Sequence, residues 1–306
     1  MRKVKFLNWF NAVLVKILPV FPKSFVWIFS RKYIAGIRLE DALEKTRHLN
    51  ASGCCATIDL LGEEIVSLDE ASSVKKTCMQ ILESIQQNGL DANLSLKLTG
   101  LGLRIDKEIC FHHTSEIVQR AAQLNNFIRI DMEDSTTTRD TLDIYRRLRK
   151  RYRNVGAVIQ AYLKRSPQDV RLSIENHTAQ FRICKGIYDE SPDIAYKDRQ
   201  MIRDQFIKLV DMMLSAGAYV GIATHDREMV NRSLTLIKEK QKSHDDYEFQ
   251  MLLGVTEKLR NRLVSEGHRM RVYVPYGEQW YAYSMRRLKE NPMLAGHIVK
   301  NLFIRG

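Results

Sequence analysis

The sequence predicts an α/β fold, a (β/α)8 barrel of the TIM type with an N-terminal helical arm. Apolar segments of strand character alternate with segments of helical periodicity from about residue 52 onward, and the strand candidates number eight. Eight β-then-α units over roughly 250 residues are typical of such a barrel. We therefore expect two parts, an amphipathic helical arm over 1–51 and a barrel over 52–306.

The arm is predicted from an apolar stripe near the start of the sequence. Its longest uncharged run, 6–15, is ten residues long, against the ~18 to 20 that a transmembrane helix needs. No small-x-small cleavage sequence follows Val20, which disfavours a secretory signal. An interfacial helix on anionic lipid and a helix packed on the barrel are equally good interpretations. The stripe recurs at helical spacing with Lys and Asn between its members, which are Phe6, Trp9, Phe10, Val13, Leu14, Ile17 and Phe21.

The strand candidates are bounded by polar and turn residues. The helix-like segments between them begin at Ser, Thr or Asp and end at Gly or Asn, for example from Ser67 to Gly89 and from Asp193 to Gly217. A doubly wound sheet is the alternative, but no G-x-G-x-x-G sequence follows the first strand. The eight candidates are 54–61, 93–100, 127–132, 155–163, 180–186, 219–225, 249–254 and 270–276.

The composition excludes several classes of protein. With 44% hydrophobic and 27% charged residues, 15 Gly and 6 Pro, the chain is a globular protein with a hydrophobic core. The adjacent His112 and His113 do not have metal-ligand spacing, and H-E-x-x-H and G-x-S-x-G are absent, so neither a metal site nor a serine hydrolase is expected. Five cysteines without a C-x-x-C pair indicate reduced thiols in a cytoplasmic protein. They are Cys54, Cys55, Cys78, Cys110 and Cys184.

The net charge of +12 is concentrated in the arm. Residues 1–39 hold eight Lys and Arg and no Asp or Glu, so the remaining 267 residues carry only +4. A basic arm suits an anionic membrane surface. The densest basic run elsewhere, 146–153, follows Asp140 and Asp143 on an expected outer helix, and we interpret it as a solvated face. A nucleic-acid partner is therefore not expected.

Alternating polarity within the strands predicts where a site would lie. In the second strand Leu94 and Leu96 alternate with Ser95 and Lys97, so one face is apolar and the other polar. Barrel enzymes build their active sites at the carboxyl ends of the strands. Singly, such inward charges are more often halves of structural ion pairs. Together, five polar residues of inward parity are expected to converge at one mouth: Lys97, Asp131, Gln160, Arg182 and Tyr273.

The charges at this mouth predict the ligand class. The mouth is expected to hold three cations, Lys97, Arg182 and Lys185, and one carboxylate, Asp131. This excess of positive charge favours an anionic group such as a carboxylate or phosphate.

A second basic group lies in the last helix-like segment, W-Y-A-Y-S-M-R-R-L-K-E-N-P at 280–292. Arg286 and Glu290 share a helix face, and Arg287 points about 100° away. The two guanidinium groups could grip a small carboxylate, with Glu290 orienting one of them or facing a substrate amine. A solvated basic helix face explains the same pattern equally well.

Several sequence motifs occur in order, each at an expected strand end or on the last helix. They are L-S-L-K-L-T, I-R-I-D-M-E-D, V-I-Q-A-Y, F-R-I-C-K-G-I-Y, A-T-H and V-Y-V-P-Y-G-x-x-W-Y-x-Y-x-x-R-R-L-x-E-x-P. Over about residues 52–306 this combination resembles proline dehydrogenase of the stand-alone bacterial type.

The resemblance implies a flavoenzyme with FAD as cofactor. Such an enzyme oxidises L-proline to Δ1-pyrroline-5-carboxylate by hydride transfer to flavin N5, the first step of proline catabolism to glutamate. The electrons pass to a membrane quinone. An enzyme that serves a membrane acceptor gains from lying on the bilayer, so a cytoplasmic protein with peripheral membrane contact through residues 1–30 is expected.

The resemblance also implies residue roles. Lys97, Arg286 and Arg287 would bind the substrate carboxylate, and Tyr273 and Glu290 would pack against or orient the proline ring. Glu63 would pair with Arg287 as a lid. Arg182 would lie beside flavin N5 with Asp131 close by, and these two are the expected catalytic residues. The other flavin contacts would come from Met132, Gln160, Lys185, Gly186, Ile187, Thr224 and His225.

Three positions bear on specificity and packing. Ile187 stands where the family usually has a small residue, and Cys184 replaces a common aliphatic residue, so the packing of the flavin pocket would differ. By the same resemblance, Tyr273 favours proline over hydroxyproline, since in the family a smaller residue at this position accompanies hydroxyproline use.

Two other functions remain as alternatives. One is a cofactor-free lyase or aldolase with Lys97 or Lys185 as the Schiff-base nucleophile. The other is a basic module that binds lipid or nucleic acid.

Overall fold

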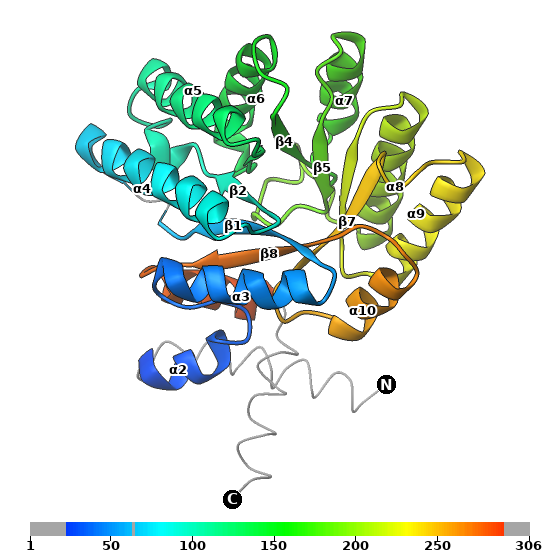
Figure 1. The fold of residues 1–306 in the computed structure, drawn as a ribbon. Helices are drawn as coiled ribbons and strands as arrows, with labels where there is room; N and C mark the ends of the chain where they lie inside the picture. Colours follow the sequence, from blue (N-terminus) through cyan, green and yellow to red (C-terminus); the bar gives the residue numbers. More distant parts are fainter. Residues whose placement is uncertain (1–22, 63–64, 291–306) are drawn as a thin grey trace, which may run out of the picture.

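The computed structural model describes residues 23–62 and 65–290. Eight parallel strands pair in chain order, and β8 pairs with β1 to close a barrel (Figure 1). This arrangement confirms the predicted (β/α)8 barrel. The strands are β1 (Cys55–Leu60), β2 (Ala92–Leu96), β3 (Ile128–Ile130), β4 (Val155–Gln160), β5 (Phe181–Cys184), β6 (Val220–Ala223), β7 (Tyr247–Leu252) and β8 (Met270–Tyr276).

The helices that follow the first seven strands form the outer layer (Figure 1). After β2 the chain makes a 3-10 turn, η2 (Thr99–Leu101), before the next helix begins. The outer helices are α4 (Leu68–Gln87), α5 (Lys107–Gln123), α6 (Ser135–Arg149), α7 (Ser166–Glu175), α8 (Arg199–Ser215), α9 (Arg227–Glu239) and α10 (Glu257–Ser265).

Helix caps determine where these helices begin. Ser67 caps α4 by accepting a hydrogen bond from the Glu70 backbone at 3.2 Å, as the sequence predicts. The prediction that α8 begins at Asp193 is wrong. Asp198 caps α8, because the preceding residues form a turn in which Ala195 pairs with Leu163 across an antiparallel bridge.

Two helices depart from the regular barrel pattern. α3 (Leu39–Ala51) precedes β1, yet it packs on β8 and β1 and takes the outer position between α10 and α4 (Figure 1). Its apolar face joins the main hydrophobic core through Ala42, Leu43 and Leu49. Residues 39–51, expected in the arm, therefore pack as part of the barrel.

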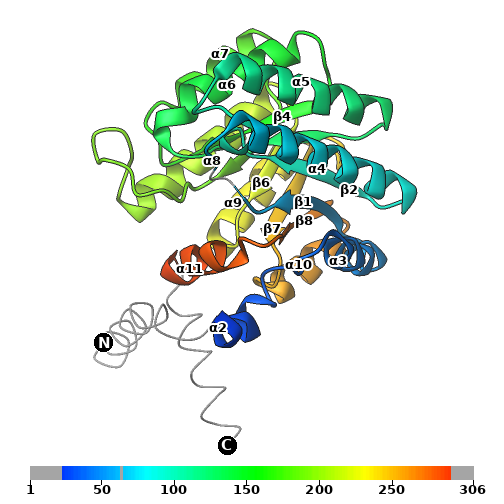
Figure 2. The ribbon, with the colours of Figure 1, turned by 90° about the vertical axis from the view of Figure 1, so that its left-hand side faces the viewer.

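The last helix, α11 (Trp280–Glu290), packs on α2 (Lys23–Ser30) at the carboxyl-terminal mouth of the barrel (Figure 2). The rings of Trp27 and Trp280 meet edge to face with centroids 4.7 Å apart. This contact belongs to a small second hydrophobic cluster of Val26, Ile34, Leu61, Trp280, Tyr283 and Met285. No helix in the described ranges combines the length and apolarity that crossing a bilayer requires.

The two faces of the strands have opposite polarity, as predicted. Leu94, Leu96 and Ile130 point toward the surrounding helices and belong to the main core. The inward face carries buried polar side chains instead, and Arg129 is among the largest fully buried side chains of the protein. A barrel interior filled with charged groups is unusual, since branched apolar residues usually fill it.

Candidate active site

Polar side chains from five strands meet at the carboxyl-terminal mouth, where the sequence predicts the site. Asp131, just after β3, lies at the centre and is 13% exposed at the side chain. Its Oδ1 accepts a hydrogen bond from Arg182 Nη1 of β5 at 2.8 Å. Its Oδ2 accepts one from the Tyr273 hydroxyl of β8 at 2.7 Å. The structure therefore brings these three predicted residues into direct contact.

Lys97 completes the cluster from the end of β2. Its Nζ donates a short hydrogen bond to the buried carboxylate of Asp59 on β1. It lies 3.5 Å from the Tyr273 hydroxyl and 3.9 Å from Asp131 Oδ2. The Arg182 guanidinium also lies 5.2 Å from the centroid of the Tyr273 ring, within the range of a cation–π contact.

The cluster sets the protonation states at the mouth. Burial would raise the pKa of Asp131, but the charges of Arg182 and Lys97 and the hydrogen bond from Tyr273 lower it below its ordinary value. Burial and the neighbouring Asp131 carboxylate raise the pKa of Tyr273 well above its ordinary value. At neutral pH the mouth therefore holds an ionised carboxylate against a protonated phenol.

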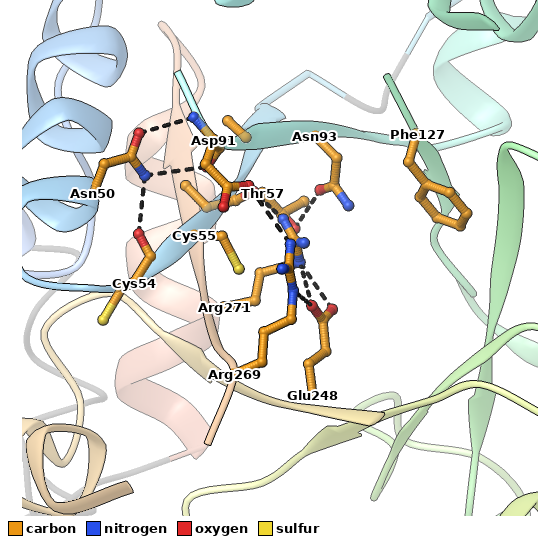
Figure 3. Close-up of polar contacts among 12 residues, drawn as sticks. Asn50, Cys54, Cys55, Thr57, Asp91, Asn93, Phe127, Glu248, Arg269 and Arg271 are labelled. Atoms are coloured by element: carbon orange, nitrogen blue, oxygen red, sulfur yellow. Dashed lines mark hydrogen bonds and ion pairs between the residues drawn. The ribbon is translucent and has the colours of Figure 1, made fainter. Parts of the chain in front are cut away.

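A second polar layer lies beneath this cluster. The Arg182 Nε donates to Gln250 Oε1 of β7, and Gln250 Nε2 donates to Glu248 Oε1 at 2.6 Å. Glu248 accepts from Arg271 Nε at 2.8 and 3.0 Å (Figure 3). Burial would raise the pKa of Glu248, but Arg271 lowers it to about 2. Hydrogen bonds thus run through the barrel from the mouth toward its amino-terminal end.

Gln160 ends β4 beside this cluster. Its Nε2 donates to the backbone oxygen of Met132 at 3.2 Å and to that of Glu133 at 3.4 Å. The residue is only 2% exposed, and its Oε1 has no hydrogen-bond partner within the described part of the chain. A buried acceptor without a donor is costly, so this oxygen is a candidate ligand contact.

Basic residues follow β5 on the same side. Lys185 Nζ and Arg203 Nε both donate to Asp226 Oδ2, at 2.8 and 2.9 Å. Burial would raise the pKa of Asp226, but the hydrogen bonds from Lys185 and Arg203 lower it to about 2. Arg203 Nη1 also lies 3.4 Å from Glu228 Oε2, so two cations face two carboxylates at this edge of the mouth. Both cations carry N–H donors that an anionic ligand could accept from.

The backbone at 186 requires glycine. Gly186 has φ +107°, and an added Cβ would lie 2.2 Å from the Tyr162 ring. The next residue, Ile187, is 38% exposed despite its apolar side chain. Both follow β5 on the side of the mouth where the sequence predicts flavin contacts.

Thr224 and His225 follow β6 and already make structural hydrogen bonds. The Thr224 hydroxyl accepts from the Asp226 backbone at 3.1 Å. The His225 Nε2 accepts from the Leu252 backbone at 2.8 Å, which fixes the imidazole against β7. Any ligand contact of His225 therefore comes from another part of its ring.

The remaining predicted residues fall partly outside the described structure. Arg286, Arg287 and Glu290 lie on α11, whose first residues follow β8 at the mouth, but their side chains are not described. Glu63 and the part of the arm over 1–22 lie outside the described residues. The carboxylate clamp, the Glu63 lid and the membrane contact remain predictions.

The sequence did not predict three residues of the network. Asp59 lies in a strand of otherwise apolar character, and Glu248 and Gln250 lie on β7. Each has the inward parity of its strand, as the contacts of Asp59 with Lys97 and of Gln250 with Arg182 demonstrate. Applying the parity rule to all eight predicted strands would have found Asp59 and Gln250, but not Glu248, which lies before the predicted strand over 249–254.

A cavity of about 500 Å³ lies at the opposite, amino-terminal end of the barrel. It is lined by residues near the strand starts, among them Asn93, Phe127, Glu248, Arg269 and Arg271 (Figure 3). Its charges are balanced, because Glu248 pairs with Arg271 and Arg269, and Arg269 lies 3.7 Å from Asp91. The predicted site therefore does not coincide with this cavity.

Comparison with known proteins agrees with this geometry. A family model described as proline dehydrogenase matches residues 42–298. Proline dehydrogenase 1 of Bacillus subtilis (strain 168) is 38% identical over 288 residues, which cover 94% of this chain and 95% of that protein. Proline dehydrogenase of Deinococcus radiodurans is 32% identical over 282 residues, 90% and 91% of the two chains.

Among solved structures, proline utilization A (PutA) from Bdellovibrio bacteriovorus, inactivated by N-propargylglycine, matches with a TM-score of 0.82. The match covers 89% of this chain and 34% of that one at 24% identity, and it shows the shared barrel fold. The family model and the two relatives also show the family to which the chain belongs. The chain belongs to the proline dehydrogenase family and is an enzyme of proline catabolism.

Proposed function

We propose that the protein oxidises L-proline to Δ1-pyrroline-5-carboxylate with FAD bound at the carboxyl-terminal mouth of the barrel. This reaction is the first step in the catabolism of proline to glutamate. The observation that carries the proposal is the cluster in which Asp131 accepts hydrogen bonds from Arg182 and Tyr273. It places a buried cation, an ionised carboxylate and an aromatic ring at the end of the barrel where such enzymes hold their substrates.

The residues present fit a flavin. Gln160 Oε1 is a buried acceptor that receives no hydrogen bond from residues 23–62 or 65–290, and a polar flavin ring would supply the donor. Lys185, 42% exposed at the side chain, and Arg203 bring two cationic donors to one edge of the mouth, which suits the pyrophosphate. Gly186 lets the backbone turn closely over Tyr162.

Within this proposal each remaining contact has a role. The Met132 backbone and Ile187 would contact the flavin, and Thr224 and His225 would hold the adenine side. Bound FAD would supply the two-electron acceptor for the hydride lost by proline. Arg182 would stabilise the negative charge that develops beside it, and Asp131 would keep the guanidinium in place.

Substrate binding would combine the cluster with α11. Lys97, Arg286 and Arg287 would bind the proline carboxylate. Because Lys97 already pairs with Asp59, most of the added positive charge would come from the two arginines. Tyr273 would present its ring to the substrate ring while its hydroxyl stays bound to Asp131. Glu290 would orient the substrate ring or amine.

The electron acceptor belongs to the same proposal. A membrane quinone would reoxidise the enzyme, and the basic, aromatic-rich segment 1–30 would bring the protein to the membrane surface. α2, the described part of that segment, packs on α11, so the arm would approach the barrel near its mouth.

The visible spectrum of the purified full-length protein tests the proposal. We expect flavin absorption bands that bleach on anaerobic addition of L-proline and bleach much less with trans-4-hydroxy-L-proline, because Tyr273 favours proline. Flavin bands that persist with L-proline would contradict the substrate. If no bands appear even after reconstitution with FAD, the flavin proposal fails, and borohydride trapping with a keto acid would then point to the lyase.

A further inference from the structure

We propose that Gln250 on β7 is a positioning residue that holds the Arg182 guanidinium in its working orientation. Neither Gln250 nor its partner Glu248 is among the residues that the resemblance implies. The inference rests on the proposed function, in which Arg182 lies beside the flavin, but the orientation itself is a property of this chain's own residues.

Two strands hold the guanidinium from different edges. Gln250 Oε1 of β7 accepts the hydrogen bond of Nε, and Asp131 Oδ1 beyond β3 accepts that of Nη1 at 2.8 Å. Arg182 is 7% exposed and Gln250 is 5% exposed, so water has little access to replace either contact. Two acceptors in fixed positions define the plane of the guanidinium, whereas one would leave it free to rotate.

The orientation of the Gln250 amide is itself fixed. Its Nε2 donates to Glu248 Oε1 at 2.6 Å, and Glu248 is held by Arg271 Nε at 2.8 and 3.0 Å. An ionised carboxylate only accepts hydrogen bonds, and a guanidinium only donates them. Only a side chain that accepts at one end and donates at the other can join Arg182 to Glu248, and the amide of glutamine does so.

The neighbouring strand leaves room for this contact. Gly221 on β6 pairs in register with Arg182 on β5 and with Glu248 on β7. A Cβ at this position would lie 2.5 Å from Gln250 Nε2 and 3.5 Å from Arg182 Cα. The amide therefore crosses β6 where β6 has no side chain. Adding a single carbon at Gly221 would displace Gln250 without altering either hydrogen-bonding residue.

The charge distribution explains why an amide is preferable to a carboxylate here. Glu248 is compensated by Arg271, so Gln250 gives Arg182 an acceptor without a second negative charge. A glutamate at 250 would place Arg182 between two carboxylates and weaken its electrostatic effect at the mouth. Gln250 therefore sets the orientation of Arg182 and leaves its positive charge available.

The first test compares Gln250→Met with Gln180→Met in the holoenzyme. Gln180 is a matched control because its side-chain oxygen has no hydrogen-bond partner among residues 23–62 and 65–290. We expect Gln250→Met to keep its flavin and lower the limiting rate of flavin reduction by proline about 10- to 100-fold. We also expect a tenfold less favourable two-electron reduction, which corresponds to a flavin potential about 30 mV more negative. The control should match the wild type in both.

A second variant guards against simple loss of folding. Gly221→Ala should change the rate and the potential in the same direction as Gln250→Met. Urea unfolding of each variant shows whether it is folded under the assay conditions. If either folded variant retains the wild-type rate and potential, Gln250 does not position Arg182.

A third measurement does not depend on flavin chemistry. The Nε–H of Arg182, assigned in ¹⁵N spectra of the full chain with an Arg182→Lys variant, should exchange with solvent at least tenfold faster in Gln250→Met. The double variant Glu248→Gln/Gln250→Glu keeps an acceptor for Arg182, so the Nε–H of Arg182 should again exchange slowly. The flavin potential should stay more negative than in the wild type, because the carboxylate at 250 adds a negative charge beside Arg182. Equal exchange rates in the wild type and Gln250→Met would overturn the inference. If proline does not bleach the flavin of the wild type, the proposed function fails. The exchange rate of the Arg182 Nε–H still tests whether Gln250 positions Arg182.

Discussion

Tyr273 on β8 donates its hydroxyl hydrogen to Asp131 Oδ2, just beyond β3, at 2.7 Å. Two other strands, β1 and β2, separate β8 from β3 around the barrel. The bond therefore spans the mouth between two strands that are not neighbours. Both residues are half-buried, and the bond also fixes the position of the proton, which stays on the phenol oxygen and not on the carboxylate.

We predict that Tyr273→Phe lowers the free energy of unfolding by about 1.5–3 kcal/mol, the range for a hydrogen bond to a charged group. The loss arises because the Asp131 carboxylate stays buried with one donor fewer. Tyr276→Phe is the matched control, because its buried hydroxyl has no partner in the described structure. Urea unfolding of both variants measures the difference, and equal losses would contradict the role given to the bond.

A second prediction concerns acid stability. Glu248 has its pKa lowered from 4.5 to about 2 in the folded protein. A lowered folded pKa adds stability that is fully present above 4.5 and is lost as pH falls toward 2. We expect Glu248→Gln to be less stable than the wild type at pH 6, because Arg271 loses its counter-charge.

The difference between wild type and Glu248→Gln should shrink by about 2 kcal/mol from pH 6 to pH 3, since the unfolded wild type then binds a proton at Glu248 that the folded wild type does not and the variant cannot. Urea unfolding at the two pH values measures it. Because both proteins share every other titrating group, their common pH dependence cancels. A difference that stays constant with pH would show that folding does not lower the pKa of Glu248.

The strand segments were predictable because each combines β-branched or aromatic residues with turn residues at its ends. The strand over 270–276 agrees with β8 residue for residue. The second strand ends earlier than predicted, at Leu96, because Thr99 begins the η2 turn. The convergence of Lys97, Asp131, Arg182 and Tyr273 followed from strand parity alone.

What the sequence did not predict depends on packing between distant segments. Glu248 fell outside the predicted strand because glutamate is a poor strand residue, yet Arg271 on the neighbouring strand stabilises it there. α3 was placed in the arm because its amphipathic pattern does not say which surface it covers. α11, which follows β8, packs on α2 at the mouth, and α3 packs on β8 and β1 instead.

We predict that Gly186→Ala is more destabilising than Gly89→Ala. Both glycines have positive φ, +107° and +59°, so both substitutions strain the backbone. Only at Gly186 would the new Cβ meet another group, the Tyr162 ring at 2.2 Å, whereas nothing lies within 4 Å at Gly89. We expect a loss of about 1–2 kcal/mol for Gly89→Ala from backbone strain.

Gly186→Ala should lose at least about 1–3 kcal/mol more, the usual cost of overpacking. Urea unfolding checks both values. If the proposed flavin site is correct, Gly186→Ala should also lower the flavin content of the purified protein, and Gly89→Ala should not. Equal stability of the two variants would show that the Tyr162 ring moves aside without lowering the free energy of unfolding.

We predict that Arg286→Met and Arg287→Met each raise the KM for proline strongly while the flavin remains bound. Each change removes a charged contact to the substrate carboxylate, and losing such a contact costs about 1.5–3 kcal/mol, or roughly 10- to 100-fold. Arg171→Met, on an exposed position of α7, serves as control. Steady-state kinetics and the visible spectrum measure the two effects. Unchanged KM in both variants would refute the clamp.

The last prediction tests the arm in the full-length protein. In Trp9→Glu/Phe10→Glu the net charge falls by two and the apolar stripe is interrupted, so sedimentation with anionic vesicles should fall sharply. Lys150→Gln/Arg151→Gln lowers the net charge by the same amount. The two residues belong to the densest basic run, 146–153, which lies outside the arm. This variant should sediment like the wild type. Because the two variants have equal charge, a loss of sedimentation confined to Trp9→Glu/Phe10→Glu identifies the arm as the membrane contact. Equal sedimentation of all three proteins would contradict this and would leave α2 and the arm only as elements that pack on the barrel.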